Sequence, residues 1–386
     1  MSELYDILVV GGGPAGAAAA LRARQLRPDA RVLLLDAADF PRDKACGDGI
    51  APHAADELAL LGAADALVGY PPVRRLRVSS PGGAEVVAQP ARPNHVVPRA
   101  VFDARLVSAA RAAGVEVRRH RVRRLTTRER WVEVDGEVAG RVVIGADGAN
   151  SVVRRQIGVA RTPPSHTAIA VRGYAAAPPG TPEQRIAMVS QGWPAYAWSF
   201  PVGDGTANVG FGKLTTRIGE EGRGGRAELY DRLAELLPDS PADPATLRAH
   251  HLPLSSGRPR QPDGRVLLAG DALSLINPLT GEGIYYALLS GRLAAEAAVH
   301  APEAAGTAYR RALERELGRH FRHTRVLARA GQLPGFLDAA VTAAARRREV
   351  FDVAVEVGLG RGTVPVGLLA TVGRSWLGSR RRPSPS

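Results

Sequence analysis

The chain has 386 residues and a net charge of +13, with 51 basic against 38 acidic side chains. This length predicts two or three domains, each large enough to bury a sizeable core. Cys46 is the single cysteine, which excludes an intrachain disulfide and a thiolate metal cluster, and we predict no metal site.

Arginine carries nearly all of the positive charge, since Lys44 and Lys213 are the only lysines. Because Ala, Gly and Pro are also abundant, we attribute this basicity to compositional bias and expect no nucleic acid partner. A positive surface still favours anionic lipid head groups or acidic partners. No signal peptide precedes the first predicted strand and no run of about eighteen apolar residues occurs, so we expect a cytoplasmic protein.

Residues 5–36 combine a short apolar strand (7–10), a glycine-rich turn, an Ala-rich helix from Ala15 and a second strand ending at Asp36. Gly11, Gly13 and Gly16 have the G-x-G-x-x-G spacing. In this motif Gly11 permits a tight turn, Gly13 lets a pyrophosphate contact the backbone, and Gly16 lets the helix pack closely on the sheet. The helix N-terminus supplies free N–H groups to the phosphates. Asp36 would accept hydrogen bonds from ribose hydroxyls, so the unit predicts FAD or NAD rather than NADP.

Helices and strands alternate over residues 39–144. Residues 39–50 (DFPRDKACGDGI) predict a loop, 54–67 an amphipathic helix, 73–87 a hairpin, 101–113 a helix and 142–144 a buried strand. Residues 115–134 have strand character, and the basic run 118–124 is expected to be a solvated face.

The pattern then changes to period-two strands over 168–174, 185–190, 196–201 and 206–212, which predict an antiparallel sheet as a second layer. A helix over 227–237 interrupts them. A buried strand over 266–269 precedes helices over 281–300, 307–333 and 334–357, and the basic tail 380–386 is expected to be disordered.

Two turns favour a flavin over NAD. The strand 266–269 leads into Asp271, whose carboxylate can reach a polyol, and Pro278, Gly281, Gly283 and Ile284 open the next helix. The positive end of that helix would face the N1–C2=O edge of a flavin, where reduction deposits negative charge. The second turn is Asp147-Gly148; each turn, taken alone, is also an ordinary Asp-Gly turn.

In this chain order, the glycine fingerprint and the two turns resemble the FAD-dependent oxidoreductases of the aromatic-hydroxylase superfamily, over roughly residues 5–300. The resemblance implies an α/β fold with a Rossmann-type FAD-binding domain (1–72, 96–165 and 263–300), an antiparallel-sheet substrate domain (73–95 and 166–262) and a helical C-terminal region (301–386). It also implies that Arg99 lies by the flavin polyol and phosphates.

Two stretches narrow the resemblance to the geranylgeranyl reductase family. Residues 196–212 match its signature Y-x-W-x-F-P…G-x-G, in which Tyr196, Trp198 and Phe200 share one strand face. Residues 40–49 are similar to its flavin-proximal loop, and their continuation is close to actinobacterial menaquinone-side-chain reductase-type members. This likeness puts four loop residues by the cofactor: Lys44, Cys46, Gly47 and Gly49.

The resemblance implies reduction of C=C bonds in a polyprenyl substrate, geranylgeranyl or menaquinone-like, by hydride from a reduced flavin and a proton from an acid. Cys46, Tyr196 and Trp198 are the catalytic candidates; the alternatives are a small buried apolar residue for Cys46 and a plain core for the aromatic residues. A different function stays open, a flavin monooxygenase or halogenase-like tailoring oxidoreductase acting on another apolar substrate. So does a flavin-binding protein without turnover.

Because only one dinucleotide fingerprint is present, we expect NAD(P)H to visit transiently, or a ferredoxin to serve as electron donor. The apolar run 364–377 beside Arg380, Arg381 and Arg382 suggests peripheral contact with the inner face of the membrane.

Overall fold

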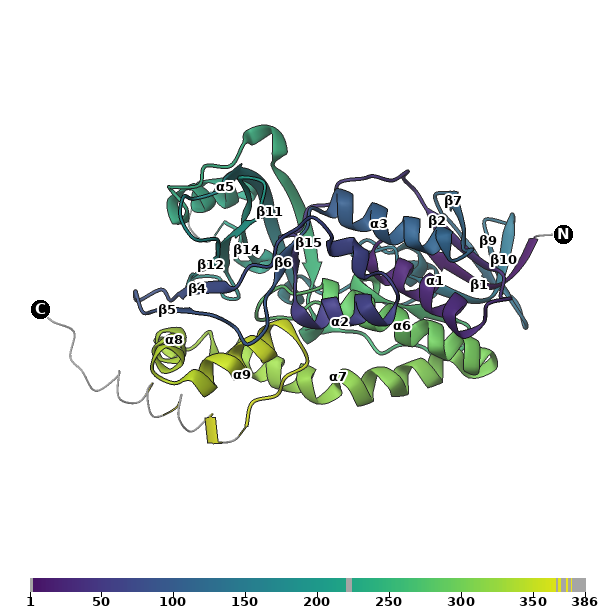
Figure 1. The fold of residues 1–386 in the computed structure, drawn as a ribbon. Helices are drawn as coiled ribbons and strands as arrows, with labels where there is room; N and C mark the ends of the chain where they lie inside the picture. The colour runs from purple at the N-terminus through teal and green to yellow at the C-terminus, as the bar shows by residue number, and fades with distance from the viewer. Residues whose placement is uncertain (1–2, 220–223, 366, 369–372, 374–375, 377–386) are drawn as a thin grey trace, which may run out of the picture.

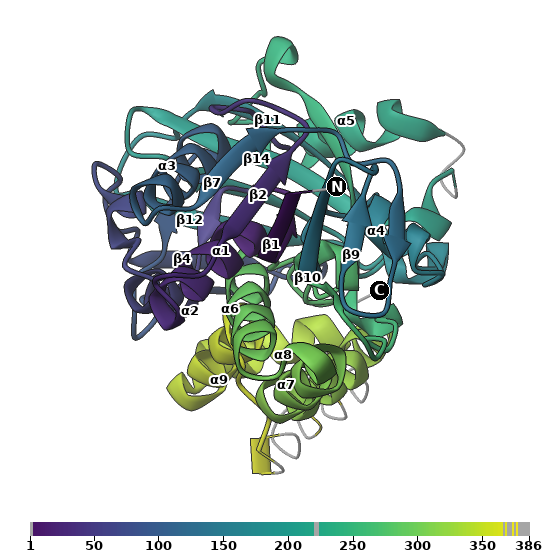
Figure 2. The same cartoon turned by 90° about the vertical axis from the view of Figure 1, so that its right-hand side faces the viewer.

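The structure is a computed structural model that describes residues 3–219, 224–365, 367, 368, 373 and 376. Two large sheets lie side by side, and a group of C-terminal helices lies along one edge of both (Figure 1). A view at right angles shows α6 and α7 beneath the first sheet (Figure 2).

The first sheet has the strand order β7-β2-β1-β10-β9-β8, with β16 beside β10. Strands β7, β2, β1, β10 and β16 are parallel, and β10, β9 and β8 pair antiparallel. Residues 7–10 of β1 and 32–35 of β2 are buried without alternation, which is typical of parallel strands covered on both faces. The bounds are β1 Glu3–Val10, β2 Val32–Asp36, β7 Glu116–Arg119, β8 Leu125–Thr127, β9 Val132–Val134, β10 Val138–Gly145 and β16 Val266–Leu268.

Helix α1 (Pro14–Leu26) packs against both α6 (Ile284–His300) and α3 (Arg99–Ala112). A Cβ at Gly291 of α6 would collide with the backbone of Ala15, so glycine permits the close approach of α6 to α1. The short helices α2 (Pro52–Leu60) and α4 (Val152–Gln156) and the pair β3 (Gly49–Ile50) and β6 (His95–Val96) complete this layer.

The second sheet has the order β15-β11-β14-β13-β12-β4-β5 and is antiparallel except for the parallel pair β12 and β4. Helix α5 (Gly225–Leu236) covers one face, where Leu229 and Leu233 pack on Val209 and Phe211. The strand bounds are β4 Arg75–Ser79, β5 Glu85–Ala88, β11 Thr167–Ala176, β12 Glu183–Met188, β13 Tyr196–Pro201, β14 Thr206–Leu214 and β15 Arg248–Pro253.

Helices α7 (Ala305–Ala330), α8 (Phe336–Arg346) and α9 (Arg348–Leu359) follow α6. Helix α7 packs on α6, and α8 packs on β5. Leu76 of β4 and Val86 of β5 share one buried cluster with Val341 of α8 and Phe351 of α9. The C-terminal helices therefore close the open end of the second sheet.

Three expected helices were wrong in extent. The helix expected over 54–67 ends at Leu60, because the chain turns at Gly62 with φ +66°, and a 3₁₀ turn follows over Ala64–Leu67. The helix expected over 334–357 is two helices, broken at Arg347, whose backbone is extended. The helix expected from about residue 281 to 300 is α6, which begins at Ile284 because Gly281 has φ +68°. The basic tail 380–386 lies outside the described residues.

Candidate active site

One cavity of about 710 Å³ lies between the two sheets and the α8–α9 pair. Every site residue predicted from the sequence lines it except Gly16. A Cβ at Gly16 would collide with the carbonyl of Gly11, so this glycine serves the packing of α1 on the turn, which is the role its spacing indicated.

The glycine-rich turn between β1 and α1 forms one end of the cavity. A Cβ on Gly13 would meet only the guanidinium groups of Arg42 and Arg99, each 3.8 Å away. Asp103 holds Arg99 through two hydrogen bonds of 2.7 and 2.8 Å, and it lies 3.3 Å from Arg42. Two fixed cations and a helix N-terminus thus surround one small space, an arrangement that suits a pyrophosphate.

Asp36 lies at the end of β2, beside the same turn. Its carboxylate accepts hydrogen bonds from the backbone N–H groups of Gly12 (2.7 Å) and Ala38 (2.9 Å), and Arg42 lies 3.4 Å away. The carboxylate is fixed in orientation and still has acceptor capacity for ribose hydroxyls.

The side chain of Asp147, a second predicted acid, forms hydrogen bonds with the chain itself. Its two oxygens accept hydrogen bonds from the Ser151 hydroxyl (2.5 Å) and from the backbone N–H groups of Val152 (2.6 Å) and Val153 (3.1 Å). The side chain therefore caps α4, and the neighbouring backbone, with Gly148, faces the cavity.

Lys44, His250 and Asp271 form a cluster of titratable groups in the cavity. The Lys44 Nζ lies 3.3 Å from the Asp271 carboxylate. Against the effect of burial, Lys44 and then His250 hold the pKa of Asp271 below its usual value. Burial, followed by the charge of Lys44, lowers the pKa of His250 to about 4, so this imidazole is neutral at pH 7. Its Nε2 is buried and has no hydrogen-bond partner among the described residues.

A buried hydrogen-bond network fixes the Cys46 loop against the second sheet. Asn208 of β14 donates to the Cys46 carbonyl (2.9 Å) and to the Asp48 carboxylate (2.7 Å), and it accepts from the Trp198 indole (2.8 Å). Tyr174 of β11 also donates to Asp48, at 2.5 Å. The network joins Cys46 and Trp198, which come from different domains and were expected to line one cavity.

Arg172 of β11 strengthens the same attachment. It is 2 % exposed, donates to the Lys44 carbonyl (3.0 Å) and pairs with Asp43 at 2.6 Å. Burial, with a smaller contribution from Asp48, raises the pKa of the Cys46 thiol. The thiol is therefore protonated at neutral pH.

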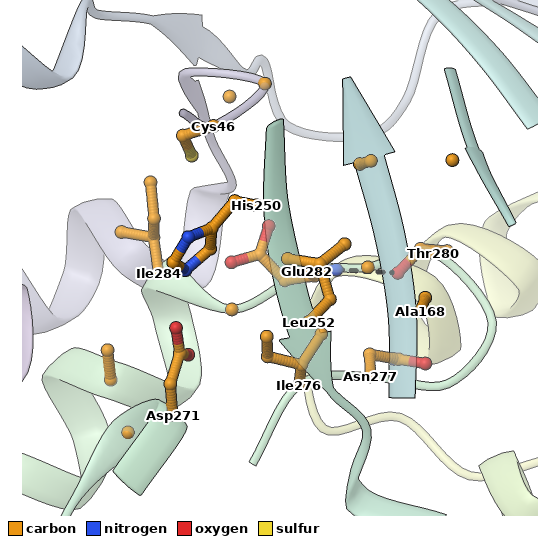
Figure 3. Close-up of a pocket in the computed structure, with 18 of the residues that line it drawn as sticks. Cys46, Ala168, His250, Leu252, Asp271, Ile276, Asn277, Thr280, Glu282 and Ile284 are labelled. Atoms are coloured by element: carbon orange, nitrogen blue, oxygen red, sulfur yellow. Dashed lines mark hydrogen bonds between the residues drawn. The ribbon is translucent and has the colours of Figure 1, made fainter. Parts of the chain in front are cut away.

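Tyr196 and Glu282 both line the cavity. The Tyr196 hydroxyl donates to the carbonyl of Thr280, and a Cβ on Gly281 would lie 2.7 Å from that hydroxyl. Burial raises the pKa of Tyr196, and the charges of Glu282 and Cys46 add to this effect. Figure 3 shows Cys46, His250, Asp271 and Glu282 reaching into one space from different elements.

The far end of the cavity is apolar. It runs between the second sheet and the helix pair, where Leu76 and Ile186 of the sheet face Val341 and Ala344 of α8 and Phe351 of α9. The predicted aromatic wall, Tyr196, Trp198 and Phe200, lines the part of the cavity nearer the loops.

Sequence reasoning missed five residues of this site: Arg42, Asp48, Asn208, His250 and Glu282. Arg42, Asp48 and Glu282 lie inside stretches already singled out, so their position next to a motif was the available signal. Asn208 and His250 reach the site through pairing of β14 and β15 with β11, which no local pattern specifies.

A family model described as "FAD binding domain" matches residues 4–290, well over half of the chain. A menaquinone reductase of Mycolicibacterium smegmatis is 32 % identical over 391 residues and covers 92 % of each chain. Digeranylgeranylglycerophospholipid reductase 1 of Methanopyrus kandleri is 34 % identical over 314 residues, covering 78 % of this chain and 81 % of that protein.

Among solved structures, a geranylgeranyl bacteriochlorophyll reductase-like protein of Thermoplasma acidophilum has a TM-score of 0.79 at 21 % identity, covering 98 % of each chain. The chain belongs to the FAD-binding-domain family of flavoproteins. Within it, the chain is a geranylgeranyl reductase-like FAD-dependent oxidoreductase, which confirms the resemblance inferred from residues 40–49 and 196–212.

The residues fit FAD as the cofactor. The space at Gly13 between Arg42 and Arg99 suits the pyrophosphate, and Asp36 suits the adenosine ribose. Asp271 and the N-terminal turn of α6 would hold the polyol and the pyrimidine edge. When bound and reduced, FAD supplies a hydride.

Proposed function

We propose that this protein reduces C=C bonds of a polyprenyl substrate, geranylgeranyl or menaquinone-like, with reduced FAD as hydride source. The observation that carries the proposal is one cavity with two different ends, a glycine-rich turn beside Arg42 and Arg99 and an apolar end. A flavin needs the first, and a flexible hydrocarbon chain suits the second. The activities named for the two relatives support the same substrate class.

In this proposal Trp198, Tyr196 and Phe200 pack against the prenyl chain near the reacting carbon atoms. Cys46 lies at the flavin face, and the buried Asn208–Asp48 network keeps its loop in place while the substrate enters. An isolated alkene has no carbonyl to polarise, so positioning and proton supply must lower much of the barrier.

The test is anaerobic incubation of the chemically reduced, FAD-loaded protein with menaquinone and with geranylgeranyl substrates, followed by mass spectrometry. A gain of two hydrogens per reduced bond, with stoichiometric flavin oxidation, is the expected result. If no prenyl substrate gains hydrogen, while oxygen with an apolar aromatic substrate gives a hydroxylated or halogenated product, the monooxygenase or halogenase-like alternative replaces this proposal.

We further propose that the electron donor is external, either NAD(P)H as a transient visitor or a ferredoxin. The support is the single glycine-rich dinucleotide turn in the part of the chain that the structure describes. Stopped-flow reduction of bound FAD by each donor distinguishes them.

The proposal includes peripheral contact with an anionic membrane, where such substrates dissolve. Helix α7 lies on the outside of the molecule (Figure 1), and its exposed face carries Arg311, Arg315, Arg319, Arg322 and Arg329, spaced at about one helical turn or a multiple of it. The apolar Val326 (62 % exposed) and Leu333 (45 %) lie at the end of this face. Among the described helices, none has the length and apolar character that a membrane crossing needs.

A further inference from the structure

Reduction of an isolated alkene by hydride also requires a proton for the second carbon. Several titratable groups that could donate it line the cavity. They are the Cys46 thiol, the Tyr196 hydroxyl, the His250 imidazole and the Glu282 carboxyl. The choice among them rests on the function proposed above.

Three of the four are poor proton donors at neutral pH. Burial raises the pKa of both Cys46 and Tyr196 above their ordinary values, so both hold their protons tightly. His250 has a pKa lowered to about 4 by burial and by Lys44, so it is already neutral and is not an acid at pH 7. The remaining ammonium, Lys44, is paired with Asp271 at 3.3 Å.

Glu282 differs in its surroundings. Its neighbours in the cavity are apolar or neutral, including Leu252, Ile276 and Ile284 (Figure 3). Burial raises the pKa of Glu282 to about 7, although backbone N–H groups of the α6 N-terminus oppose the shift. No arginine or lysine among the described residues contributes to this pKa or pairs with the carboxylate. The titratable groups that lie near it or act on it, Tyr196, Tyr286 and His250, are uncharged at this pH.

The carboxyl group is also held in a defined place. Its Oε1 accepts a hydrogen bond from the Tyr285 N–H (2.8 Å), and the Glu282 N–H donates to Thr280 Oγ1 (3.3 Å). Tyr196 fixes the same turn through the Thr280 carbonyl. Glu282 therefore lies between Gly281 and Gly283, on a turn that contacts Tyr196 of the aromatic wall.

We propose that Glu282 is the catalytic acid that completes C=C reduction. The alkene π bond breaks, one carbon receives hydride from the reduced flavin, and the other forms a C–H bond with the Glu282 proton. The flavin leaves the step oxidised by two electrons, the Glu282 side chain leaves it as a carboxylate, and water reprotonates that carboxylate before the next turnover. The N–H groups at the start of α6 stabilise the carboxylate between turnovers.

The test compares wild type with Glu282→Gln and Glu282→Asp in single turnovers, in which prenyl substrate oxidises the reduced flavin under nitrogen. We expect Glu282→Gln to slow this oxidation by a factor of about 10² or more, while oxidation of the reduced flavin by oxygen is unchanged. The wild-type rate constant falls above pH 7, since the acid form is lost, and Glu282→Asp restores part of the rate. Glu314→Gln, an exposed acid on α7, is the control.

A second measurement does not depend on turnover. Infrared difference spectra of the apoprotein between pH 5.5 and 8.5 are expected to show a protonated-carboxyl band that titrates near pH 7 and is missing in Glu282→Gln. Absence of that band in wild type overturns the proposal, as does a Glu282→Gln protein with the wild-type rate and pH profile. Failure of wild type to reduce any prenyl substrate contradicts instead the function proposed above.

Discussion

Gly13 and Gly16 belong to one motif, yet the structure gives them different consequences on mutation. A Cβ on Gly13 enters open space 3.8 Å from Arg42 and Arg99, whereas a Cβ on Gly16 collides with the Gly11 carbonyl. We expect Gly13→Val to keep the fold and melting behaviour of the apoprotein but to lose at least 100-fold in FAD affinity. Isothermal titration with FAD and circular dichroism measure both properties.

The matched variant Gly16→Val is expected to fail at folding, because backbone cannot move aside as a flexible side chain can. A Gly13→Val protein that is purified with a full complement of FAD would contradict the assignment of the pyrophosphate to this turn.

Asp48 gives a second prediction at this scale, through pH. It is completely buried, one of its oxygens has no partner, and burial raises its pKa from 3.8 to about 6. A carboxyl that binds its proton more tightly when folded contributes stability that is fully present below about pH 4 and is lost as pH rises through about 6. The shift of roughly two pKa units corresponds to about 3 kcal/mol.

Asp48→Asn keeps the shape of the side chain and removes its titration. We expect the unfolding free energy of the variant, minus that of wild type, to rise by up to about 3 kcal/mol between pH 4 and pH 7. Denaturant titrations of the apoprotein at several pH values measure this difference. Parallel pH profiles for the two proteins would mean that Asp48 does not titrate in this range.

At the scale of elements, local pattern predicted the parts of the site that are continuous in sequence. The strand expected over 196–201 is β13 with the same bounds, because its alternation and its flanking turns are local. The wall formed by α8 and α9 was not predicted. Its apolar residues form a wall only because Val341 and Phe351 pack against Leu76 and Val86, which lie more than two hundred residues earlier in the chain. No local pattern predicts that contact. The same holds for Asn208, which strand pairing brings to the Cys46 loop, and for His250, which it brings to the cavity.

The α8–α9 wall yields a prediction about substrate length. Ala344 lines the apolar end of the cavity, while its neighbour Ala345 is exposed. We expect Ala344→Phe to fill that space and to raise the KM for long-chain prenyl substrates at least tenfold, with little change for a short analogue. Steady-state kinetics with both substrates is the measurement.

Ala345→Phe adds the same ring to solvent and serves as the control. FAD content should be the same in both variants, since the phosphate-binding turn lies at the other end of the cavity. If Ala344→Phe handles long and short substrates as wild type does, the hydrocarbon chain does not occupy this end.

At the scale of the whole molecule, the five exposed arginines of α7 outnumber its one exposed acid, Glu314, whose side chain is 56 % exposed and pairs with Arg322. Each arginine near an anionic bilayer contributes about 1 kcal/mol. We expect Arg315→Glu with Arg319→Glu to lower partition into phosphatidylglycerol vesicles at least tenfold at low salt. Cosedimentation at low and high salt measures the partition.

Arg123→Glu with Arg124→Glu makes the same change of charge on an exposed loop of the first sheet and is the control. Wild type should leave the vesicles at high salt, because the attraction is screened. If wild type binds vesicles at neither salt concentration, or if both double variants lose the same amount of binding, α7 is not the contact surface.

The three-part construction of the flavin site has a consequence for synthesis on the ribosome. The phosphate turn, Arg99 and the acid Asp271 come from three regions of the chain, and β16 joins the first sheet beside β10 only after the second sheet has been made. Until α6 has emerged and packed on α1 through Gly291, the proposed FAD site of the nascent chain is incomplete. With this assignment of the site, we expect FAD to bind late, to finished or nearly finished chains.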